Sequence, residues 1–168
     1  MFGGKTTRLL TVIERDMIRG LKVACFKPLI DIRYSQQKIT SHLGATVNAT
    51  VIRDGEDILR FVRANTCDSV AVDELFMVPN SGKALVEVFR MGINVYVSTL
   101  QLSSIPESYV EVDAILPWAT EVKVCPAVCV QCGADAYYTY KKGGDPNAAV
   151  EIGGANLYEP RCFQHFFS

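Results

Sequence analysis

The chain has 168 residues, 49% of them hydrophobic, which is enough to bury the core of one domain with a small appendage. Its formal net charge of -1, with both signs interspersed, argues against partners such as nucleic-acid polymers or a membrane surface. No apolar run reaches the roughly 18 residues of a membrane-spanning helix and no signal peptide is visible, so we expect a cytoplasmic protein with reduced cysteines.

Residues 1–7 match the second half of a phosphate-binding loop. In the full pattern, G-x-x-x-x-G-K-[ST], backbone N–H groups close on phosphate oxygens, the lysine reaches the terminal phosphates and the hydroxyl binds Mg²⁺. The half-loop comprises Gly3, Gly4, Lys5, Thr6 and Thr7. The first glycine and the preceding strand would fall before Met1, so we expect a reading frame that continues upstream or a fragment. Because Gly-Lys-Thr is common by chance, its interpretation depends on the rest of the chain.

The next segment has helical periodicity. Apolar residues recur at the spacing of one helix face: Leu9, Leu10, Ile13 and Met17. Gly20 is placed to end this helix. A helix that begins at Gly4 or Lys5 directs its free N–H groups and the positive end of its dipole at the loop, where a phosphate would lie.

Two apolar stretches then predict strands, one over 23–26 that closes at Lys27 and one over 46–52. The segment between them, 29–41, has no periodicity. It carries the polar residues Asp31, Arg33, Tyr34 and Ser35. We interpret it as a functional loop, and a plain solvated loop is the alternative.

Asp54 and Gly55 turn the chain into a second helix, and the apolar run 69–72 then leads directly to two acidic residues. Ligands collect at the carboxyl ends of parallel strands. We therefore expect Asp73 to complete a Mg²⁺ shell and Glu74 to act as a general base. The alternative is two solvated carboxylates at a strand end, and the upstream Gly-Lys-Thr favours the functional interpretation.

The remaining elements of this region continue the alternation. Ser81 is placed to cap a helix that ends at Gly92, a strand follows over 93–98, and the composition of 110–116 predicts a weak strand. Alternating strands and helices predict an α/β fold with a parallel sheet flanked by helices. The composition changes at Cys125, where we place a domain boundary.

The C-terminal region, 125–168, contains two short chelating pairs, whereas 1–124 contains none. The pairs are Cys129-x-x-Cys132 and Cys162-x-x-His165. Thiolate and imidazole pairs on two turns are how a tetrahedral structural zinc is assembled, so we predict zinc, and four reduced residues without metal are the alternative. Cys125 could compete as a ligand, whereas Cys25 and Cys67 suit the core.

Seven motifs, spread over nearly the whole chain, resemble the zinc-containing, type II thymidine kinase family. They are Gly4-Lys5-Thr6, Asp31-x-Arg33-Tyr34-Ser35, Ser41-His42, Val72-Asp73-Glu74, Ala127-Val128-Cys129-x-x-Cys132, Ile152-Gly153-Gly154-Ala155-x-x-Tyr158 and Cys162-x-x-His165. The resemblance implies a P-loop NTPase-like kinase domain over 1–124, and a zinc-held lasso over 125–168 that closes on the nucleoside. It further implies transfer of the γ-phosphate of ATP to the 5′-hydroxyl of thymidine, usually in a homotetramer.

The resemblance also assigns roles to single residues. Lys5 would steady the β and γ phosphates, and Thr6 and Asp73 would bind Mg²⁺. Glu74 would take the proton of the attacking hydroxyl, and Arg33 would neutralise charge on the transferring group. The nucleoside pocket would be formed by Met1, Leu100, Tyr109, Ile152, Gly153 and Tyr158.

The sequence departs from the family's pattern in three places. Leu75-Phe76-Met77 follows Glu74 where the family usually has x-Gln-Phe, Gln101 replaces a common aspartate, and Ser104 replaces a ring that typically covers the base. Since catalytic residues are kept better than base-stacking ones, we expect deoxyuridine or another pyrimidine deoxynucleoside beside thymidine as substrate. Two alternatives stay open: a different P-loop NTPase whose zinc tail binds nucleic acid, and a catalytically impaired or fragmentary relative that keeps fold and zinc.

Overall fold

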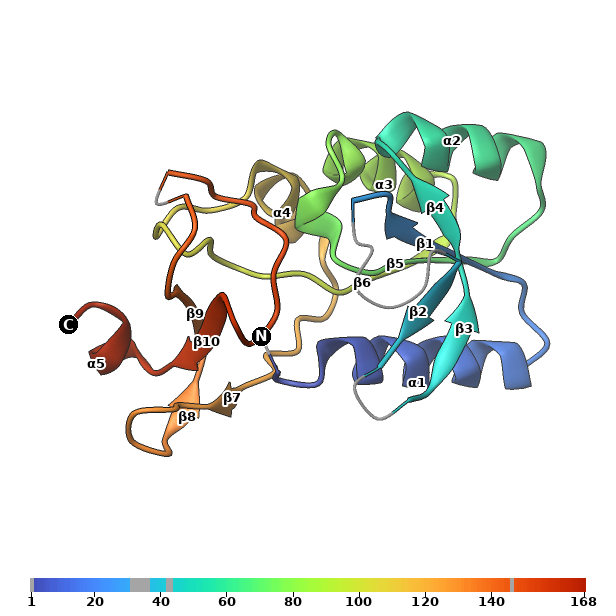
Figure 1. The fold of residues 1–168 in the computed structure, drawn as a ribbon. Helices are drawn as coiled ribbons and strands as arrows, with labels where there is room; N and C mark the ends of the chain where they lie inside the picture. The colour runs from blue at the N-terminus through green and yellow to red at the C-terminus, as the bar shows by residue number, and fades with distance from the viewer. Residues whose placement is uncertain (1, 31–36, 42–43, 146) are drawn as a thin grey trace.

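A sheet of four parallel strands, in the order β4-β1-β5-β6, forms the centre of the fold (Figure 1). The computed structural model describes residues 2–30, 37–41, 44–145 and 147–168. The strands are β1 (Val23–Pro28), β4 (Thr50–Ile52), β5 (Ser69–Val72) and β6 (Asn94–Val97). Phe26 of β1 lies opposite Thr50 on one side and Val72 on the other, and Val72 lies opposite Val97. The predicted parallel sheet is confirmed.

Helices cover both faces of this sheet (Figure 1). They are α1 (Lys5–Ile18) on one face, and α2 (Gly55–Ala64) and α3 (Ser81–Arg90) on the other. Side chains alternate along β5, so that Val70 and Val72 pack against α2 and α3 while Ala71 packs against α1. A strand that is buried on both faces needs an apolar run without polar alternation, and the sequence of β5 has this pattern.

The buried face of α1 differs from the prediction at one position. Met17 is 44% exposed, whereas Asp16 is buried. The carboxylate tolerates burial because it accepts hydrogen bonds from the Ser69 hydroxyl at 2.7 Å and the Tyr96 hydroxyl at 2.9 Å. The helix ends as predicted, with Gly20 in the left-handed conformation (φ 82°) just after it.

The N-termini of α2 and α3 are formed differently. Asp54 caps α2 by accepting a hydrogen bond from the Asp57 N–H at 3.2 Å. The predicted cap of α3 is wrong, because Ser81 is the first helical residue and its hydroxyl donates to the Val78 carbonyl at 2.6 Å. Asn80 precedes the helix in a left-handed conformation and makes no side-chain cap.

The apolar stretch 46–52 forms two strands rather than one. β3 (Thr46–Asn48) pairs antiparallel with β2 (Lys38–Thr40), and β4 pairs in parallel with β1. Ala49 lies at the break, where its N–H donates to the Gln37 carbonyl at 3.0 Å. Periodicity alone could not reveal that the two halves have different partners.

The predicted strand over 110–116 is wrong, because α4 (Val110–Ile115) is a helix. Val112 is buried against Phe76 and Tyr109, whereas Val110 is 73% exposed. The short helix η2 (Leu116–Trp118) follows α4 directly, and another short helix, η1 (Leu75–Met77), lies after β5. None of the helices in the described ranges is long and apolar enough to cross a membrane.

Small antiparallel ribbons form the C-terminal part of the chain (Figure 1). Their elements are β7 (Ala127–Val128), β8 (Asp135–Ala136), β9 (Tyr138–Lys141), β10 (Tyr158–Arg161) and the short helix α5 (Phe163–Phe166). β7 pairs with β8, and β9 pairs with β10. Four aromatic rings pack together at the end of this part: Tyr138, Phe163, Phe166 and Phe167.

Candidate functional site

The first turn of α1 meets the end of β5. Gly4 precedes the helix with φ 75°, a left-handed conformation that glycine adopts readily. The Thr6 hydroxyl lies 3.3 Å from each carboxylate oxygen of Asp73, although the two residues are 67 positions apart. Two motifs that the sequence presents separately are therefore brought together at the carboxyl end of the sheet.

Gly3 allows this N-terminal segment to contact the C-terminal part. A Cβ at this position would lie 2.0 Å from the Cys125 carbonyl oxygen, so only glycine fits without a backbone shift. The half-loop of residues 3–7 is thus packed against the start of the region that carries the cysteine pairs.

Asp73 is a buried carboxylate surrounded by hydroxyl groups. Its Oδ1 accepts a short hydrogen bond from the Ser98 hydroxyl, just beyond β6, in addition to the contact with Thr6. Burial and the negative charge of Glu74 raise the pKa of Asp73 to about 6, against the opposing effects of Ser98, Lys5 and Thr6. A nearby cation would therefore favour the ionised form strongly.

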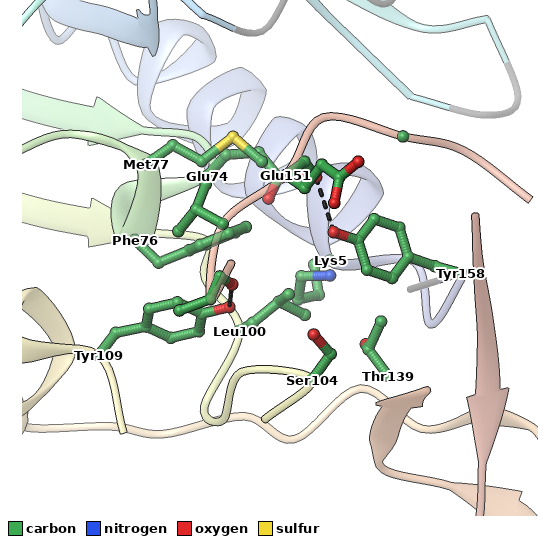
Figure 2. A pocket seen from close by; sticks show the side chains of 13 residues that line it. Lys5, Glu74, Phe76, Met77, Leu100, Ser104, Tyr109, Thr139, Glu151 and Tyr158 are labelled. Atoms are coloured by element: carbon green, nitrogen blue, oxygen red, sulfur yellow. Dashed lines mark hydrogen bonds between the residues drawn. The ribbon is translucent and has the colours of Figure 1, made fainter. Parts of the chain in front are cut away.

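Glu74 has an unusual backbone conformation. It follows β5 with φ 54° and ψ 47°, in the left-handed region that costs a non-glycine residue about 1–3 kcal/mol. The Ser98 carbonyl accepts the Leu75 N–H at 3.0 Å, which holds the chain in this turn. The turn ends β5 and brings Glu74 to the lining of a pocket that Lys5 also lines (Figure 2).

This pocket lies between the carboxyl end of the sheet and the C-terminal ribbons, and its empty space, which is partly open to solvent, is about 440 Å³. It is lined by Lys5, Glu74, Phe76, Met77, Leu100, Ser104, Tyr109, Thr139, Ala149, Val150, Glu151, Gly153 and Tyr158. The Phe76 and Tyr109 rings pack 4.7 Å apart on one side, and Tyr158 stands on the other (Figure 2). The apolar walls suit a flat, uncharged ligand, and Lys5 and Glu74 place a cation and a carboxylate where a second, charged ligand could meet it.

Two tyrosines of the pocket hold the segment between β9 and β10. The Tyr158 hydroxyl donates to the Glu151 carbonyl at 2.8 Å, and the Tyr109 hydroxyl donates to the Ala149 carbonyl at 3.2 Å. Burial, with Tyr158 and Glu74 nearby, raises the pKa of Tyr109, so its hydroxyl stays protonated. Lys141 adds an ion pair with the Glu151 carboxylate at 2.5 Å.

Four predicted nucleoside-pocket residues line this cavity, Leu100, Tyr109, Gly153 and Tyr158, together with Lys5 and Glu74, which were predicted as catalytic residues. Ile152 is 41% exposed and lies beside the lining rather than in it. Met1 and Arg33 lie outside the described residues, as do the motif residues Asp31, Tyr34, Ser35 and His42.

Sequence reasoning missed much of the lining, notably Phe76, Met77, Thr139 and Glu151. Phe76 and Met77 directly follow the acidic pair, so their position beside Glu74 was a usable signal. Thr139 and Glu151 belong to segments that reach the pocket only through the pairing of β9 with β10. No local pattern marks them.

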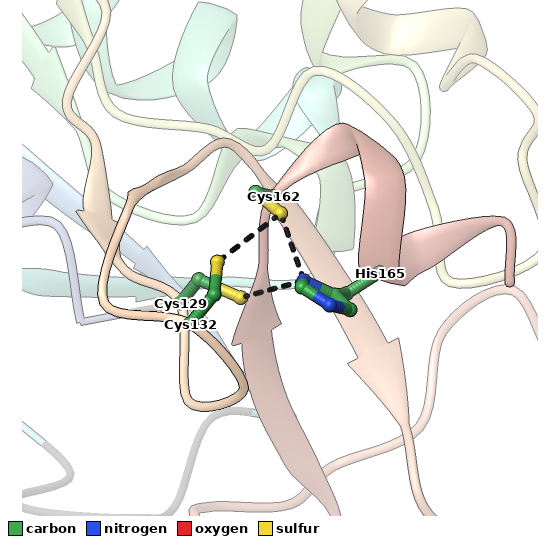
Figure 3. Close-up of side chains that lie close together, drawn as sticks. All are labelled: Cys129, Cys132, Cys162 and His165. Atoms are coloured by element: carbon green, nitrogen blue, oxygen red, sulfur yellow. Dashed lines mark hydrogen bonds between the residues drawn. The ribbon is translucent and has the colours of Figure 1, made fainter.

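The four predicted zinc ligands converge at one point (Figure 3). The ligand atoms of Cys129, Cys132, Cys162 and His165 all lie within 4.8 Å of one another. Cys132 Sγ lies 3.8 Å from Cys162 Sγ, and His165 Nδ1 lies 3.2 Å from Cys162 Sγ and 3.8 Å from Cys129 Sγ. Ligands of a tetrahedral zinc lie about 3.5–3.8 Å apart, given bonds of about 2.3 Å to sulfur and about 2.0 Å to nitrogen, so the group fits zinc.

Backbone groups prepare one of these thiols for metal binding. Burial opposes ionisation of Cys129, but N–H groups of Cys162, Gln131 and Cys132 outweigh it and lower its pKa to about 6. Among the described residues, Cys125 is not part of the group, and its Sγ lies 3.8 Å from the Lys123 carbonyl instead. Cys25, as predicted, is buried in the core.

Comparison with known proteins agrees with the motif pattern. A family model described as thymidine kinase matches residues 1–166. The thymidine kinase of Bdellovibrio bacteriovorus is 33% identical over 167 residues, which cover 99% of this chain and 81% of that protein. The thymidine kinases of Pyrobaculum aerophilum (34% over 174 residues; 99% and 94% covered) and Thermococcus kodakarensis (31% over 175 residues; 98% and 89% covered) are similarly related. The resemblance found in the sequence is thereby confirmed, and the chain belongs to the thymidine kinase family.

Proposed function

We propose that this chain transfers the γ-phosphate of ATP to the 5′-hydroxyl of thymidine, or of deoxyuridine, to give the nucleoside monophosphate. Family membership over residues 1–166 supports ATP as phosphate donor and a nucleoside as acceptor, and favours a working kinase over the alternatives left open by the sequence. The observation that carries the proposal is the meeting of Thr6 with Asp73 beside a pocket that Lys5 and Glu74 share.

The phosphate side of the site would be formed by α1 and β5. Gly3, Gly4 and Thr7 would place backbone N–H groups around the phosphates, at the positive end of the α1 dipole. Lys5 would bind the β and γ phosphates. The hydroxyl of Thr6 and the carboxylate of Asp73 offer adjacent oxygen ligands of the kind Mg²⁺ prefers, and when bound the ion would neutralise charge on the phosphates.

Glu74 is proposed as the general base. Its carboxylate belongs to the lining of the same pocket as Lys5, and the left-handed turn at φ 54° orients the residue away from the line of β5. A base within reach of the 5′-hydroxyl accepts its proton as the oxygen attacks phosphorus. Arg33, proposed from the family pattern to neutralise the transferring group, completes the catalytic set.

The nucleoside would bind in the pocket between the sheet edge and the ribbons. Leu100 and Tyr109 offer apolar surface to the base, and Gly153 and Tyr158 belong to the segment that encloses it. Ile152 and Met1 are proposed as flanking residues from the family pattern. Loop backbone groups held in place by Tyr158 and Tyr109 would present a fixed hydrogen-bonding edge, which discriminates between bases better than apolar contacts do.

The region 125–168 is proposed to fold as a zinc-held lasso subdomain beside a kinase domain over 1–124. The mutual distances of Cys129, Cys132, Cys162 and His165 support zinc as the structural ion. From the family resemblance we also propose a cytoplasmic homotetramer. The formal net charge of -1 supports the absence of a nucleic-acid or membrane partner.

A coupled assay of ADP release over a panel of deoxynucleosides tests the function. We expect release that depends on Mg²⁺ and is stimulated most by thymidine or deoxyuridine. Thr6→Ala should abolish the stimulation, whereas Thr11→Ala, on an exposed part of the same helix, should not. Absence of nucleoside-stimulated release, with retention of oligonucleotide at moderate salt, would instead support the NTPase with a nucleic-acid-binding tail.

A further inference from the structure

The pocket contains a buried hydroxyl group, that of Ser104, with no role in the phosphate transfer proposed above. Ser104 lines the pocket, its Oγ is shielded from solvent, and it has no hydrogen-bond partner within the described part of the chain. Figure 2 shows this hydroxyl pointing into the pocket, beside Thr139. The neighbouring Ser103 behaves differently, since its hydroxyl donates to the Ile105 carbonyl.

Buried polar groups are nearly always hydrogen-bonded, because an unpaired one keeps the full penalty of its desolvation. An exception that faces a ligand pocket is therefore a candidate donor to the ligand. Since no group in the described ranges bonds to the Ser104 hydroxyl, we expect the protein without ligand to gain no stability from it.

The other hydroxyls around the pocket indicate which role is left for Ser104. The Tyr109 and Tyr158 hydroxyls are both donated to backbone carbonyls of the loop between β9 and β10. Lys5 and Glu74 are the charged groups of the phosphate-transfer end. A pyrimidine dione bound between apolar walls presents two carbonyl oxygens, which need donors once they leave water.

Resting on the proposed function, we propose that the Ser104 hydroxyl donates a hydrogen bond to a carbonyl oxygen of the pyrimidine base, and that Ser104 thereby determines base specificity. A site built around such a bond rejects analogues that lack the acceptor more strongly than an apolar wall rejects a change in size. The bound base would then satisfy a hydroxyl for which the described residues supply no partner.

The test combines Ser104→Ala with substrate analogues and two readouts. Calorimetric binding of thymidine should weaken about 3- to 10-fold in the variant, the effect of one neutral hydrogen bond. The unfolding midpoint of the variant without ligand should be equal to or above that of the parent protein, since an unpaired buried hydroxyl has been removed. A residue with a purely structural role would instead lower the midpoint.

The analogues identify the bond itself. In 2-thiothymidine and 4-thiothymidine, sulfur, a weak acceptor, replaces one carbonyl oxygen. The parent protein should bind one of the two several-fold less tightly than thymidine, and Ser104→Ala should lose that discrimination. Ser108→Ala is the matched control, because this serine is exposed and its hydroxyl donates to Asp113 at 2.7 Å. It should bind all three nucleosides as the parent does.

The outcomes separate the two proposals. If the parent protein binds and phosphorylates thymidine while Ser104→Ala binds it equally tightly or keeps the same discrimination, the role of Ser104 is refuted and the kinase function stands. If the parent protein neither binds nor phosphorylates any nucleoside, the proposed function fails, and the inference fails with it.

Discussion

Two aspartates near opposite ends of β5 accept hydrogen bonds from hydroxyl groups, and their pKa values shift in opposite directions. Asp16 meets Ser69, the first residue of β5, whereas Asp73 follows the last residue and meets Ser98. Burial opposes ionisation of Asp16, but hydrogen bonds from Ser69 and Tyr96, together with the positive charges of Arg19 and Arg15, outweigh it and lower its pKa. Burial and the charge of Glu74 raise the pKa of Asp73. A buried carboxylate with a raised pKa beside a second carboxylate is typical of functional sites, whereas Asp16 belongs to a buried hydrogen-bond network with Ser69 and Tyr96.

Replacing Glu74 tests the proposed general base. Glu74→Gln keeps the size of the side chain and removes its basicity, so kcat should fall about 10²- to 10⁴-fold while ATP affinity stays near normal. Steady-state kinetics and calorimetric titration of ATP measure the two quantities. Glu87→Gln, an exposed substitution on α3, should change neither. Joint loss of turnover and ATP binding would make Glu74 a structural residue.

Asp16 should control stability in acid. Because its pKa is lower in the folded protein than the ordinary value of 3.8, its stabilisation is present above that value and is lost as pH falls through the folded pKa. Asp16→Asn should reduce the free energy of unfolding by about 1–3 kcal/mol at pH 7, and the difference from the parent should shrink below about pH 4. Urea unfolding at a series of pH values measures this difference in the free energy of unfolding. Glu14→Gln, exposed on the same helix, should show no such pH-dependent difference, and a constant difference for Asp16→Asn would contradict the argument.

At the scale of single elements, the sequence predicted what local pattern determines. The strands at 23–26 and 69–72 and the first two helices are confirmed, because hydrophobic periodicity and punctuating residues such as Gly20 and Asp54 are local signals. The errors at Ser81 and 110–116 have one tertiary cause. α4 packs against α3 and supplies its cap, so a β-branched segment becomes helical and the local serine is not needed as the cap.

Glu111 of α4 is the residue that joins these two helices. Its Oε1 accepts the Asn80 N–H at 2.7 Å and its Oε2 accepts the Gly82 N–H at 2.8 Å, so both oxygens cap α3. Glu111→Ala should lower the free energy of unfolding by about 1–2 kcal/mol, the usual effect of losing a cap. Glu111→Gln, which keeps one acceptor, should lose less. Chemical denaturation measures both, and equal stability of all three proteins would contradict the capping role.

At the scale of the whole molecule, the sequence predicts the short motifs of the candidate site but not the residues that form the pocket walls. The four candidate metal ligands, Lys5, Thr6 and Asp73 belong to short motifs whose spacing predicts their chemistry. The pocket walls come from segments that meet only in the folded chain, such as Thr139 of β9 with Ser104 beyond β6. Pairing partners that are distant in sequence leave no local signal, which is why wall residues such as Thr139 and Glu151 were missed.

The metal group should control nucleoside binding more than ATP binding. It joins the turn after β7 to the end of β10, and β10 begins at Tyr158, whose hydroxyl holds the loop that encloses the pocket. Thr6 lies on α1 and Asp73 follows β5, so both belong to the part of the chain that precedes the metal group. After treatment with a zinc-selective chelator, in excess Mg²⁺, the unfolding midpoint should fall and thymidine affinity should weaken about tenfold or more, because the loop is no longer preorganised. The affinity for Mg-ATP should change less than about threefold, and thermal shifts with each ligand measure the two affinities.

Cys125→Ser, at a thiol outside the group, should respond as the parent does. Equal loss of both ligands would show that the metal stabilises the molecule as one unit, and the proposed separation of roles would then be wrong.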